Sequence, residues 1–389
     1  MTVGSAYLRG ARIVIIGAGA LGSVSAYRLA QAGADVTVVE RRFPGAGTTG
    51  NSFAWLNSFG KVPRDYHRLN ARSMREHLDL ARELDGDWVH VDGGLNWAHA
   101  DNAQHANRLK ETARRLHEWG YRIEVLTPEQ VMKDIEPDLF IDPDRVEEVY
   151  YSPNEGWVNG VGLCHGAISA AVRRYGARIV NDVVVGFDVN AGSIEAVKLA
   201  SGESLPADAV INAAGPDAAR VAQLLGIELQ IRRQPGVLVV TEPAPVNLKA
   251  VVHAPETFVH ADGGWRLLLH REDYDALVES EQPLDISHPH GQQAVENASA
   301  ILPGLRGIRA EGIRMGIRPM PRDGHPIVGF EESVPNFFEL VMHSGVTLSA
   351  TMGMLVTETF LGTPPTELEP YQPSRFEQGA PLPAAATNE

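Results

Sequence analysis

The sequence contains a single cysteine, Cys164, among 389 residues. One cysteine excludes an internal disulfide and any cysteine-based metal cluster. We therefore expect no disulfide framework and no metal site. The near absence of cysteine also fits a reducing compartment.

Long hydrophobic runs are missing as well. No stretch reaches the roughly 18 apolar residues that a membrane-spanning helix needs. The first apolar run, Ile13 to Ile16, ends in glycine and is too short to be the hydrophobic part of a signal peptide. These absences predict a cytoplasmic protein without an integral membrane segment.

Positive charge is scarce. There are 34 Lys and Arg residues against 49 Asp and Glu residues, which gives a formal net charge of −15. This balance argues against nucleic acid and against a basic membrane-binding surface. The chain is long enough for two domains with cores of their own, and we expect its partner to be a small-molecule substrate.

What the sequence does contain begins with "IVIIGAGALGSVSAYRLAQAGADVTVVE", residues 13–40. A β-branched run leads into a glycine turn, a helical pattern and a second strand. Gly17 permits the tight turn, Gly19 lets backbone approach a pyrophosphate, and Gly22 lets helix and strand pack closely. Ala20 and Leu21 open the helix, whose N-terminus favours phosphate. The ligand is a nicotinamide dinucleotide, a flavin dinucleotide, or none.

Glu40 ends the second strand, where a carboxylate can accept both ribose hydroxyls. An acid at this position disfavours a 2′-phosphate and so disfavours NADP. Arg41 follows, so the charge beside the ribose is mixed, and we include it among the cofactor-binding residues. The polar loop "RRFPGAGTTGNSFAWLNS" then suits a ligand whose second half turns back over the first. This loop favours FAD over NAD.

Dinucleotide-binding segments occur near both ends of the chain, and a strand-rich region from about 229 to 276 lies between them. We predict an α/β (α+β) fold, with a Rossmann-like nucleotide-binding domain and an interleaved substrate domain built on a mainly antiparallel sheet. The predicted nucleotide-binding domain comprises 12–80, 150–225 and 320–376. The substrate domain comprises 81–149 and 226–319, and 377–389 is a flexible tail.

Five segments in order resemble the FAD-dependent oxidoreductases of the D-amino-acid oxidase type, which include glycine oxidase and sarcosine oxidase. They are "GAGALGSVSAYRLAQAGADVTVVE", "GTTGNSFAWLN", "ADAVINAAGPDA", "GIRPMPRDGHPIVG" and "HSGVTLSATMGMLVTETFLG". The resemblance covers roughly 12–376. It implies oxidation of the C–N bond of a small amine or amino acid by hydride transfer to flavin N5, followed by imine hydrolysis. The alternative is a FAD-dependent 2-hydroxy acid dehydrogenase.

The resemblance also implies cofactor-binding residues beyond the first turn. It implies oxygen or another electron acceptor and leaves a monomer or a small homo-oligomer open. A loop along the pyrophosphate and the isoalloxazine edge would contribute Thr48, Thr49, Asn51 and Ser52, and backbone near the adenine would contribute Val184. A second glycine turn would contribute Ala214 and Gly215. The N–H groups facing flavin N1 and O2 would be those of Gly345, Val346, Thr347 and Leu348.

On the substrate side, Arg318 matches an arginine that binds the substrate carboxylate in D-amino-acid and glycine oxidases, where a planar fork suits a carboxylate. The alternative is a structural arginine in an ion pair near the flavin. "RLLLHREDYD" adds His270 and Arg271 as catalytic candidates, and Asp273 as a partner for a substrate ammonium. A solvated strand end is the competing interpretation.

We also expect FAD to be non-covalent. Gly50 and Asn51 occupy the place of the histidine that attaches FAD in some members of the family, and Cys164 lies far from the late attachment motif.

Overall fold

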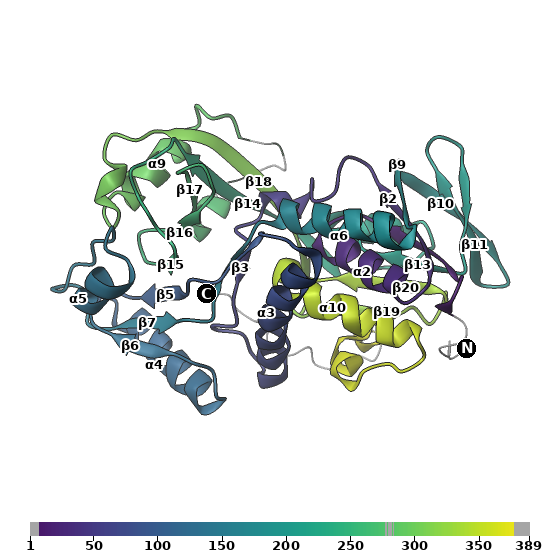
Figure 1. The fold of residues 1–389 in the computed structure, drawn as a ribbon, viewed down its shortest axis with the longest axis horizontal. Helices are drawn as coiled ribbons and strands as arrows, with labels where there is room; N and C mark the ends of the chain where they lie inside the picture. Colours follow the sequence, from purple (N-terminus) through teal and green to yellow (C-terminus); the bar gives the residue numbers. More distant parts are fainter. Residues whose placement is uncertain (1–7, 277, 279–281, 283, 377–389) are drawn as a thin grey trace.

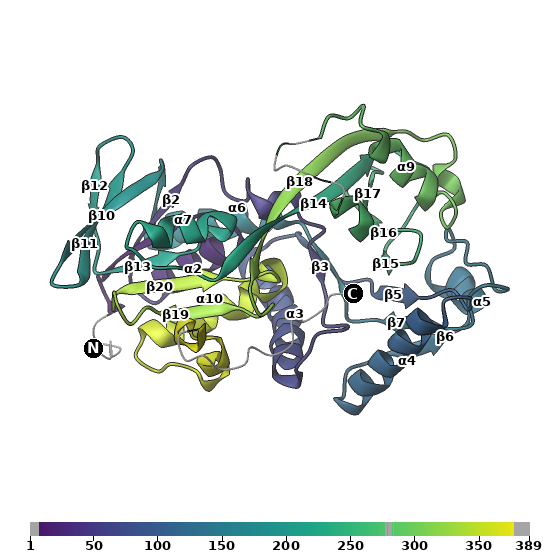
Figure 2. The same ribbon diagram turned by 180° about the vertical axis from the view of Figure 1, so that it is seen from behind.

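The computed structural model describes residues 8–276, 278, 282 and 284–376. The predicted tail, 377–389, lies outside them. The molecule has two lobes side by side, each built on one large sheet (Figures 1 and 2). Two long strands, β14 and β18, reach from one lobe toward the other.

The first lobe is built on a six-stranded sheet with the order β19-β20-β13-β1-β2-β9. Neighbours pair in parallel except for β19 and β20. The predicted apolar run at 13–16 forms the buried part of β1, as a strand covered on both faces requires. The strands are β1 (Arg12–Ile16), β2 (Asp35–Glu40), β9 (Arg178–Asn181), β13 (Ala209–Asn212), β19 (Ile327–Phe330) and β20 (Phe337–Val341).

Helices cover this sheet, and α2 packs between α6 and α10 (Figure 1). Close approach of α2 and α10 depends on Gly353, because a Cβ there would lie 2.7 Å from the Val24 side chain. The main helices are α2 (Ala20–Gln31), α3 (Arg64–Leu84), α4 (Ala103–Glu118), α6 (Gly160–Tyr175), α9 (Pro289–Ala298) and α10 (Gly345–Phe360).

The second lobe is built on an eight-stranded sheet with the order β18-β14-β17-β16-β15-β5-β7-β6. Its pairs are antiparallel apart from β15 and β5. Together with the parallel sheet, it confirms the predicted fold class. The strands are β5 (Gly94–Trp97), β6 (Glu124–Leu126), β7 (Val149–Ser152), β14 (Ile231–Thr241), β15 (Val251–His253), β16 (Phe258–Ala261), β17 (Leu267–His270) and β18 (Ala310–Pro321).

The register of this sheet places selected side chains on one face. Leu238 pairs with His270 on one side and with Arg314 on the other. Directly opposed residues point to the same side, and alternate residues along a strand share a face. The face that carries these three residues and Arg318 is called the inner face here. It packs against the loop after β2, since Leu238 and its neighbours contact Phe53.

Two three-stranded sheets and several short helices complete the fold. Their orders are β3-β8-β4 and β10-β11-β12. The remaining elements are η1 (Thr48–Asn51), β3 (Trp55–Leu56), β4 (Val89–His90), α5 (Pro128–Gln130), η2 (Val131–Ile135), β8 (Gly156–Val158), β10 (Val184–Asn190), β11 (Ser193–Leu199), β12 (Ser204–Pro206), η3 (Gly215–Asp217), α7 (Ala218–Gln223), α8 (Glu272–Asp275), η4 (Pro303–Leu305), η5 (Thr366–Tyr371) and η6 (Pro373–Phe376).

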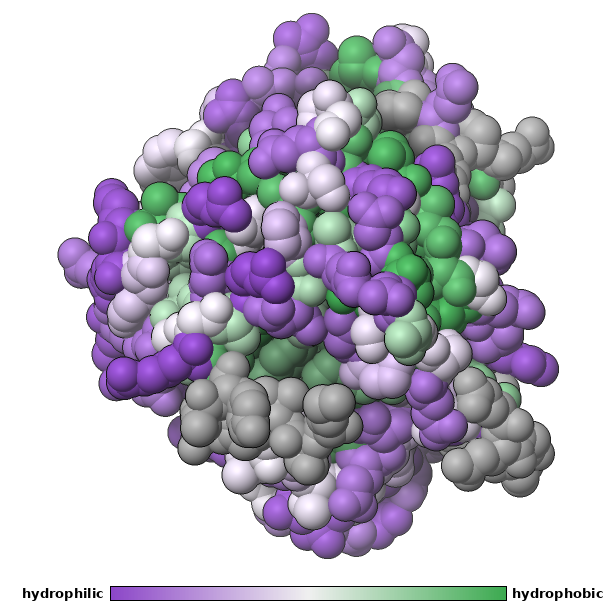
Figure 3. Space-filling view, turned by 90° about the vertical axis from the view of Figure 1, so that its right-hand side faces the viewer, coloured by the Kyte–Doolittle hydropathy of each residue, from purple (hydrophilic) through white to green (hydrophobic). Residues whose placement is uncertain are grey.

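The end of the molecule that carries β9 and β10 is mainly hydrophilic, with hydrophobic residues showing between the polar ones (Figure 3). Val183, Val185 and Val189 are about half exposed there. Within the described part of the chain, no helix is long and apolar enough to cross a membrane. The same residues contain no group of three or more His, Cys, Asp or Glu side chains that could hold a metal ion.

Candidate functional site

The first glycine turn leaves no room for larger residues. Gly17 has a φ of +102°, and a Cβ on it would lie 2.6 Å from the carbonyl oxygen of Ala213. A Cβ on Gly22 would lie 2.0 Å from the carbonyl oxygen of Gly17. Only glycine allows this close packing of β1, α2 and the turn after β13. In front of α2, by contrast, a Cβ on Gly19 would meet only the Thr49 hydroxyl, at 3.3 Å.

Glu40 lies beside this turn. Its carboxylate accepts a hydrogen bond from the Ala18 N–H at 2.9 Å and another from the Arg42 N–H at 2.9 Å. Arg41 turns toward Asp217 at the second glycine turn, with 2.8 Å between the charged groups. Gly215, in that second turn, has a φ of +58° and nothing within 4 Å of where its Cβ would be. The two turns thus form one cradle of backbone groups, which fits the pyrophosphate and ribose of a dinucleotide.

The loop after β2 connects the cradle to the second lobe. The Thr49 hydroxyl accepts from the Ala20 N–H at 3.1 Å, at the start of α2. The Thr48 hydroxyl donates to the carbonyl oxygen of Ile317 in β18. A Cβ on Gly316 would lie 2.3 Å from the carbonyl oxygen of Asn51. The predicted threonines therefore lie at the junction of the two lobes.

The N-terminus of α10 meets the same junction. Ser344 precedes the helix, and its hydroxyl accepts from Tyr66 at 2.9 Å and from the Lys61 ammonium at 3.3 Å. The Thr347 hydroxyl donates to the Trp55 carbonyl oxygen at 2.9 Å, so only its backbone N–H is left for the predicted role. The first N–H groups of a helix attract negative charge.

Arg318 lies on the inner face and is already in an ion pair. Its Nη2 lies 2.6 Å from Asp275 Oδ2 and donates to the Pro235 carbonyl oxygen at 3.0 Å. Its Nε is buried without a hydrogen-bond partner. Asp275, only 6% exposed, also accepts from the Val237 N–H at 2.7 Å. The ion pair left open from the sequence is therefore present, and its acid is Asp275.

His270 completes this cluster. Its Nδ1 lies 3.0 Å from the Val237 carbonyl oxygen, so Nδ1 carries the proton that it donates. Its Nε2 then presents a lone pair 3.8 Å from Asp275. Burial lowers the pKa of His270, and the nearby Asp275 opposes that shift. The cluster is thus an imidazole whose Nε2 faces the Asp275 carboxylate, next to the arginine that pairs with the same acid.

Arg271 and Asp273 are not brought into this cluster. Arg271 pairs with Asp273 at 2.8 Å and donates to the Glu256 carbonyl oxygen. As the next residue after His270, it points to the other side of the sheet. Asp273 is mostly exposed. The structure therefore gives Arg271 no contact with the inner face.

Aromatic rings and histidines stack beside the cluster. Trp157 stacks between His90 at 4.0 Å and His260 at 4.8 Å, and His260 contacts Phe53 at 4.6 Å. Both ring nitrogens of His260 lie within hydrogen-bond distance of backbone carbonyl oxygens, of Phe53 and Ala261. Burial lowers the pKa of His260, and the two carbonyl oxygens oppose that shift. This stack positions the loop after β2 and supplies no reactive group.

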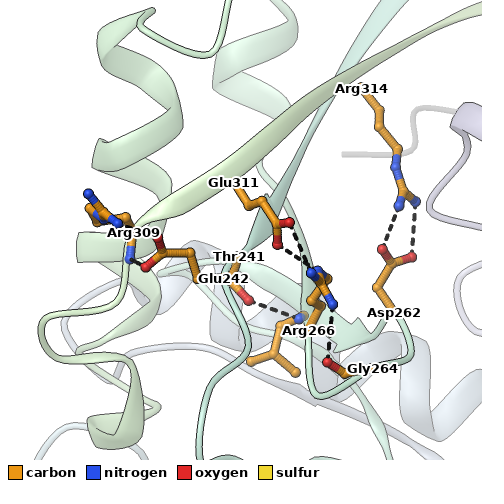
Figure 4. Close-up of polar contacts among 9 residues, drawn as sticks. Thr241, Glu242, Asp262, Gly264, Arg266, Arg309, Glu311 and Arg314 are labelled. Atoms are coloured by element: carbon orange, nitrogen blue, oxygen red, sulfur yellow. Dashed lines mark hydrogen bonds and ion pairs between the residues drawn. The ribbon is translucent and has the colours of Figure 1, made fainter.

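A larger cavity, of about 620 Å³, is lined by Thr49, Ser52, His260 and Arg314, among others. Arg314 is not available to share the role of Arg318, because it forms a two-bond ion pair with Asp262 (Figure 4). Arg266 with Glu311 and Arg309 with Glu242 continue a row of ion pairs along β18. This row holds the turn after β16 against β18.

Sequence reasoning missed Asp275, Lys61 and Ser344. Asp275 lies two residues beyond the predicted Asp273. Both acids belong to the short helix α8, and Asp275 is the one that turns toward the inner face. Its position just before the predicted N–H groups of α10 was a signal that could have pointed to Ser344. For Lys61 there was none.

Comparison with known proteins gives a family. Residues 12–359 match the family described as FAD dependent oxidoreductase (DAO). One of the subunits of opine oxidase from Agrobacterium tumefaciens is 28% identical, over 94% of this chain and 97% of its own length. The structure of iminodiacetate oxidase from Chelativorans is 26% identical, with a TM-score of 0.78, over 93% of this chain and 99% of its own. L-proline dehydrogenase from P. horikoshii, at 21% identity, shares the fold with a TM-score of 0.83, over 95% of this chain and 99% of its own.

Proposed function

Since this chain belongs to the FAD-dependent oxidoreductase (DAO) family, we propose that it oxidises the C–N bond of a small amino acid or N-substituted amino acid. The single observation that carries the proposal is the Arg318–Asp275–His270 cluster on the inner face. Arg318 lies two residues from Gly316, which packs against Asn51 of the loop after β2. Relatives named for oxidising opines and iminodiacetate support an amine rather than an alcohol.

The residues of the junction fit FAD, and we propose that they hold it. The glycine turns take the pyrophosphate, Glu40 the ribose, and the α10 N-terminus the pyrimidine end of the flavin. The proposed set is Gly17, Gly19, Ala20, Leu21, Gly22, Glu40, Arg41, Thr48, Thr49, Asn51, Ser52, Val184, Ala214, Gly215, Arg318, Gly345, Val346, Thr347 and Leu348.

We propose that attachment is non-covalent. Cys164 is fully buried in α6, and burial raises the pKa of its thiol to about 12. A buried thiol with a raised pKa is a poor nucleophile. The loop at Gly50 and Asn51 offers no histidine.

When bound, FAD would supply the hydride acceptor, and the chain supplies binding and proton handling. Cationic side chains bind and orient the substrate carboxylate. Neutral His270 accepts a proton at Nε2 from the substrate ammonium, and Asp275 stabilises the resulting imidazolium. The amine must lose this proton before the C–H bond can deliver hydride. The imine product is then hydrolysed by water.

The alternative, oxidation of a 2-hydroxy acid, is favoured by one observation. Alcohol oxidation needs a base for the hydroxyl proton. The Nε2 lone pair of His270 offers one, because Nδ1 is hydrogen-bonded to the Val237 carbonyl oxygen, and Asp275 lies 3.8 Å from the same Nε2. The same dyad serves both reactions, so the substrate decides between them.

The test is anaerobic mixing of FAD-loaded protein with glycine, D-amino acids, N-methyl and N-carboxyalkyl amino acids, and 2-hydroxy acids, followed at 450 nm. Bleaching by an amine supports the proposal, and bleaching by hydroxy acids alone supports the alternative. Recovery in air distinguishes oxygen from another electron acceptor. Absence of bleaching by every compound would refute both.

We also retain the division into two interleaved domains as a proposal, with the 149/150 boundary falling inside β7. A monomer or small homo-oligomer stays a prediction, which light scattering would test.

A further inference from the structure

Lys61 lines an enclosed region that β18, the strand of Arg318, also borders. A small cavity beside the α10 N-terminus is lined by Lys61, Tyr66, Met320 and His343 among others. Met320 lies two residues after Arg318 on β18, so both side chains are on the inner face. The pKa of His343 falls to about 3, because of burial first and then the positive charges of Lys61 and Arg318. The charges of both cations therefore reach His343, which lines this cavity.

The two cations differ in their counter-charges. Arg318 is paired with Asp275 at 2.6 Å. Within the described residues, the Lys61 ammonium has one hydrogen-bond partner, the neutral Ser344 hydroxyl, and no carboxylate within 4 Å. Burial lowers the pKa of Lys61 to about 8, which the more distant Glu155 opposes. An enclosed ammonium without an anion in contact is unfavourable, and an arriving anion relieves that cost.

Glu155 does not supply this anion. Its Oε1 is occupied by the N–H groups of Ser58 and Phe59 and by the Tyr121 hydroxyl at 2.6 Å. Burial raises the pKa of Glu155 to about 7, so its charge is only partial near neutrality. The local balance around Lys61 therefore favours a negative ligand.

Ser344 adds a hydrogen-bond donor at the same place. Its oxygen accepts from Tyr66 at 2.9 Å and from Lys61 at 3.3 Å. A hydroxyl has two acceptor positions and one proton. With both acceptor positions filled, the Ser344 proton is directed toward a third group. Ser344 precedes a 16-residue helix, whose N-terminus also favours negative charge.

We propose that Lys61, with the Ser344 hydroxyl, is the principal anchor for the substrate carboxylate, and that Arg318, neutralised by Asp275, is secondary. This deepens the proposed function and rests on it for the identity of the ligand. The cavity holds about 10 Å³, close to the minimum for one water. Lys61 and Met320 are long and unbranched, so rotamer changes enlarge it. Tyr66 is a positioning residue that orients Ser344.

The first experiment needs no turnover. FAD-loaded protein is titrated with acetate, propionate and benzoate, and the dissociation constant is read from the change in flavin absorbance. Lys61→Met should weaken binding by about 10- to 100-fold, since a charge-assisted contact is lost. Lys61→Arg should stay within about threefold. Lys133→Met removes an exposed lysine of η2 and serves as the matched control.

The pH dependence provides a second readout. Affinity of the wild type should fall about tenfold per pH unit above pH 8, where the Lys61 ammonium loses its proton. The titratable groups around this ammonium are Glu155, Tyr66 and His343, and the charge of Arg318 also acts on His343. Lys61→Arg should move that decline above pH 10, because arginine stays charged.

Three outcomes would overturn the proposal. In the first, Lys61→Met keeps its carboxylate affinity while Arg318→Met loses it. In the second, the wild type binds no carboxylate at all. In the third, Lys61→Met binds FAD more weakly but binds carboxylates as the wild type does. The proposed function fails separately, if no amine bleaches the flavin while carboxylates still bind in a Lys61-dependent way. With an active amino acid, Lys61→Met should raise KM and leave kcat within about threefold, and amines lacking a carboxylate should be unaffected.

Discussion

The nucleotide cradle and the inner face, which we propose both hold charged ligands, are built by different means. In the cradle, backbone N–H groups and glycines do the work, and a single added carbon at Gly22 would meet the Gly17 carbonyl at 2.0 Å. On the inner face, side-chain charges do it, and Arg318 is held by Asp275 from another element. The glycines of the cradle tolerate no larger residue. On the inner face, by contrast, the charge that Arg318 offers to a ligand can be changed by substituting its partner.

The largest effect should come from Gly22→Ala. The added methyl group cannot be accommodated without separating α2 from β1, so FAD binding should be lost. Purified protein should be colourless, and added FAD should restore no absorbance at 450 nm. Gly312→Ala is the control, because its Cβ would meet only the Val240 side chain, at 4.0 Å. Yellow Gly22→Ala protein would show that the cradle is less rigid than described.

Asp275→Asn should give the next largest effect and changes the charge balance of the inner face. Removing the acid leaves Arg318 without its counter-charge, which should lower the free energy of unfolding by about 3 kcal/mol. The same change should free Arg318 for the ligand and tighten acetate binding severalfold. It should also partly restore binding to Lys61→Met. Chemical denaturation and the acetate titration measure the two effects.

The control for this prediction is Asp273→Asn, which removes an exposed acid from the same short helix. We expect less than about 0.5 kcal/mol from it. If Asp275→Asn leaves acetate affinity unchanged even in the Lys61→Met background, Arg318 does not act on the ligand at all.

A smaller effect should come from Glu155→Gln and depends on pH. The folded-state pKa of Glu155 is raised to about 7 from 4.5, so the folded protein binds the extra proton between these values. Stability should therefore fall as pH rises from about 5 to 8. Relative to Glu155→Gln, we expect a loss of about 2–3 kcal/mol across that range. Thermal unfolding at pH 5, 6, 7 and 8 tests it, and parallel curves for the two proteins would contradict it.

The cradle was predictable because its signals are local. Gly17, Gly22 and Glu40 lie within one βαβ unit, and their spacing alone places them together. The start of α10 was predictable for the same reason. The fold class followed from strand-rich and helical segments, with glycine turns near both ends of the chain.

The inner face was only partly predictable. Arg318 followed from its motif, but its partner depends on how β14, β18 and α8 meet, and the two residues are 43 apart in sequence. Nothing within "REDYD" tells which acid turns inward. Lys61 lies 283 residues from Ser344 along the chain, and only the folded junction brings them together. Pairs that form across strands and between lobes leave no local pattern.

The order of strands in the six-stranded sheet has a consequence for biosynthesis. β13 lies between β1 and β20, and α10 follows β20 directly. A nascent chain that has emerged only as far as β19 therefore has both glycine turns and the threonine loop, but lacks β20 and the helix end beside Ser344. We therefore expect the cofactor to bind at the end of synthesis or after release of the chain. Chains truncated before residue 345 should bind no cofactor and should be degraded by proteases.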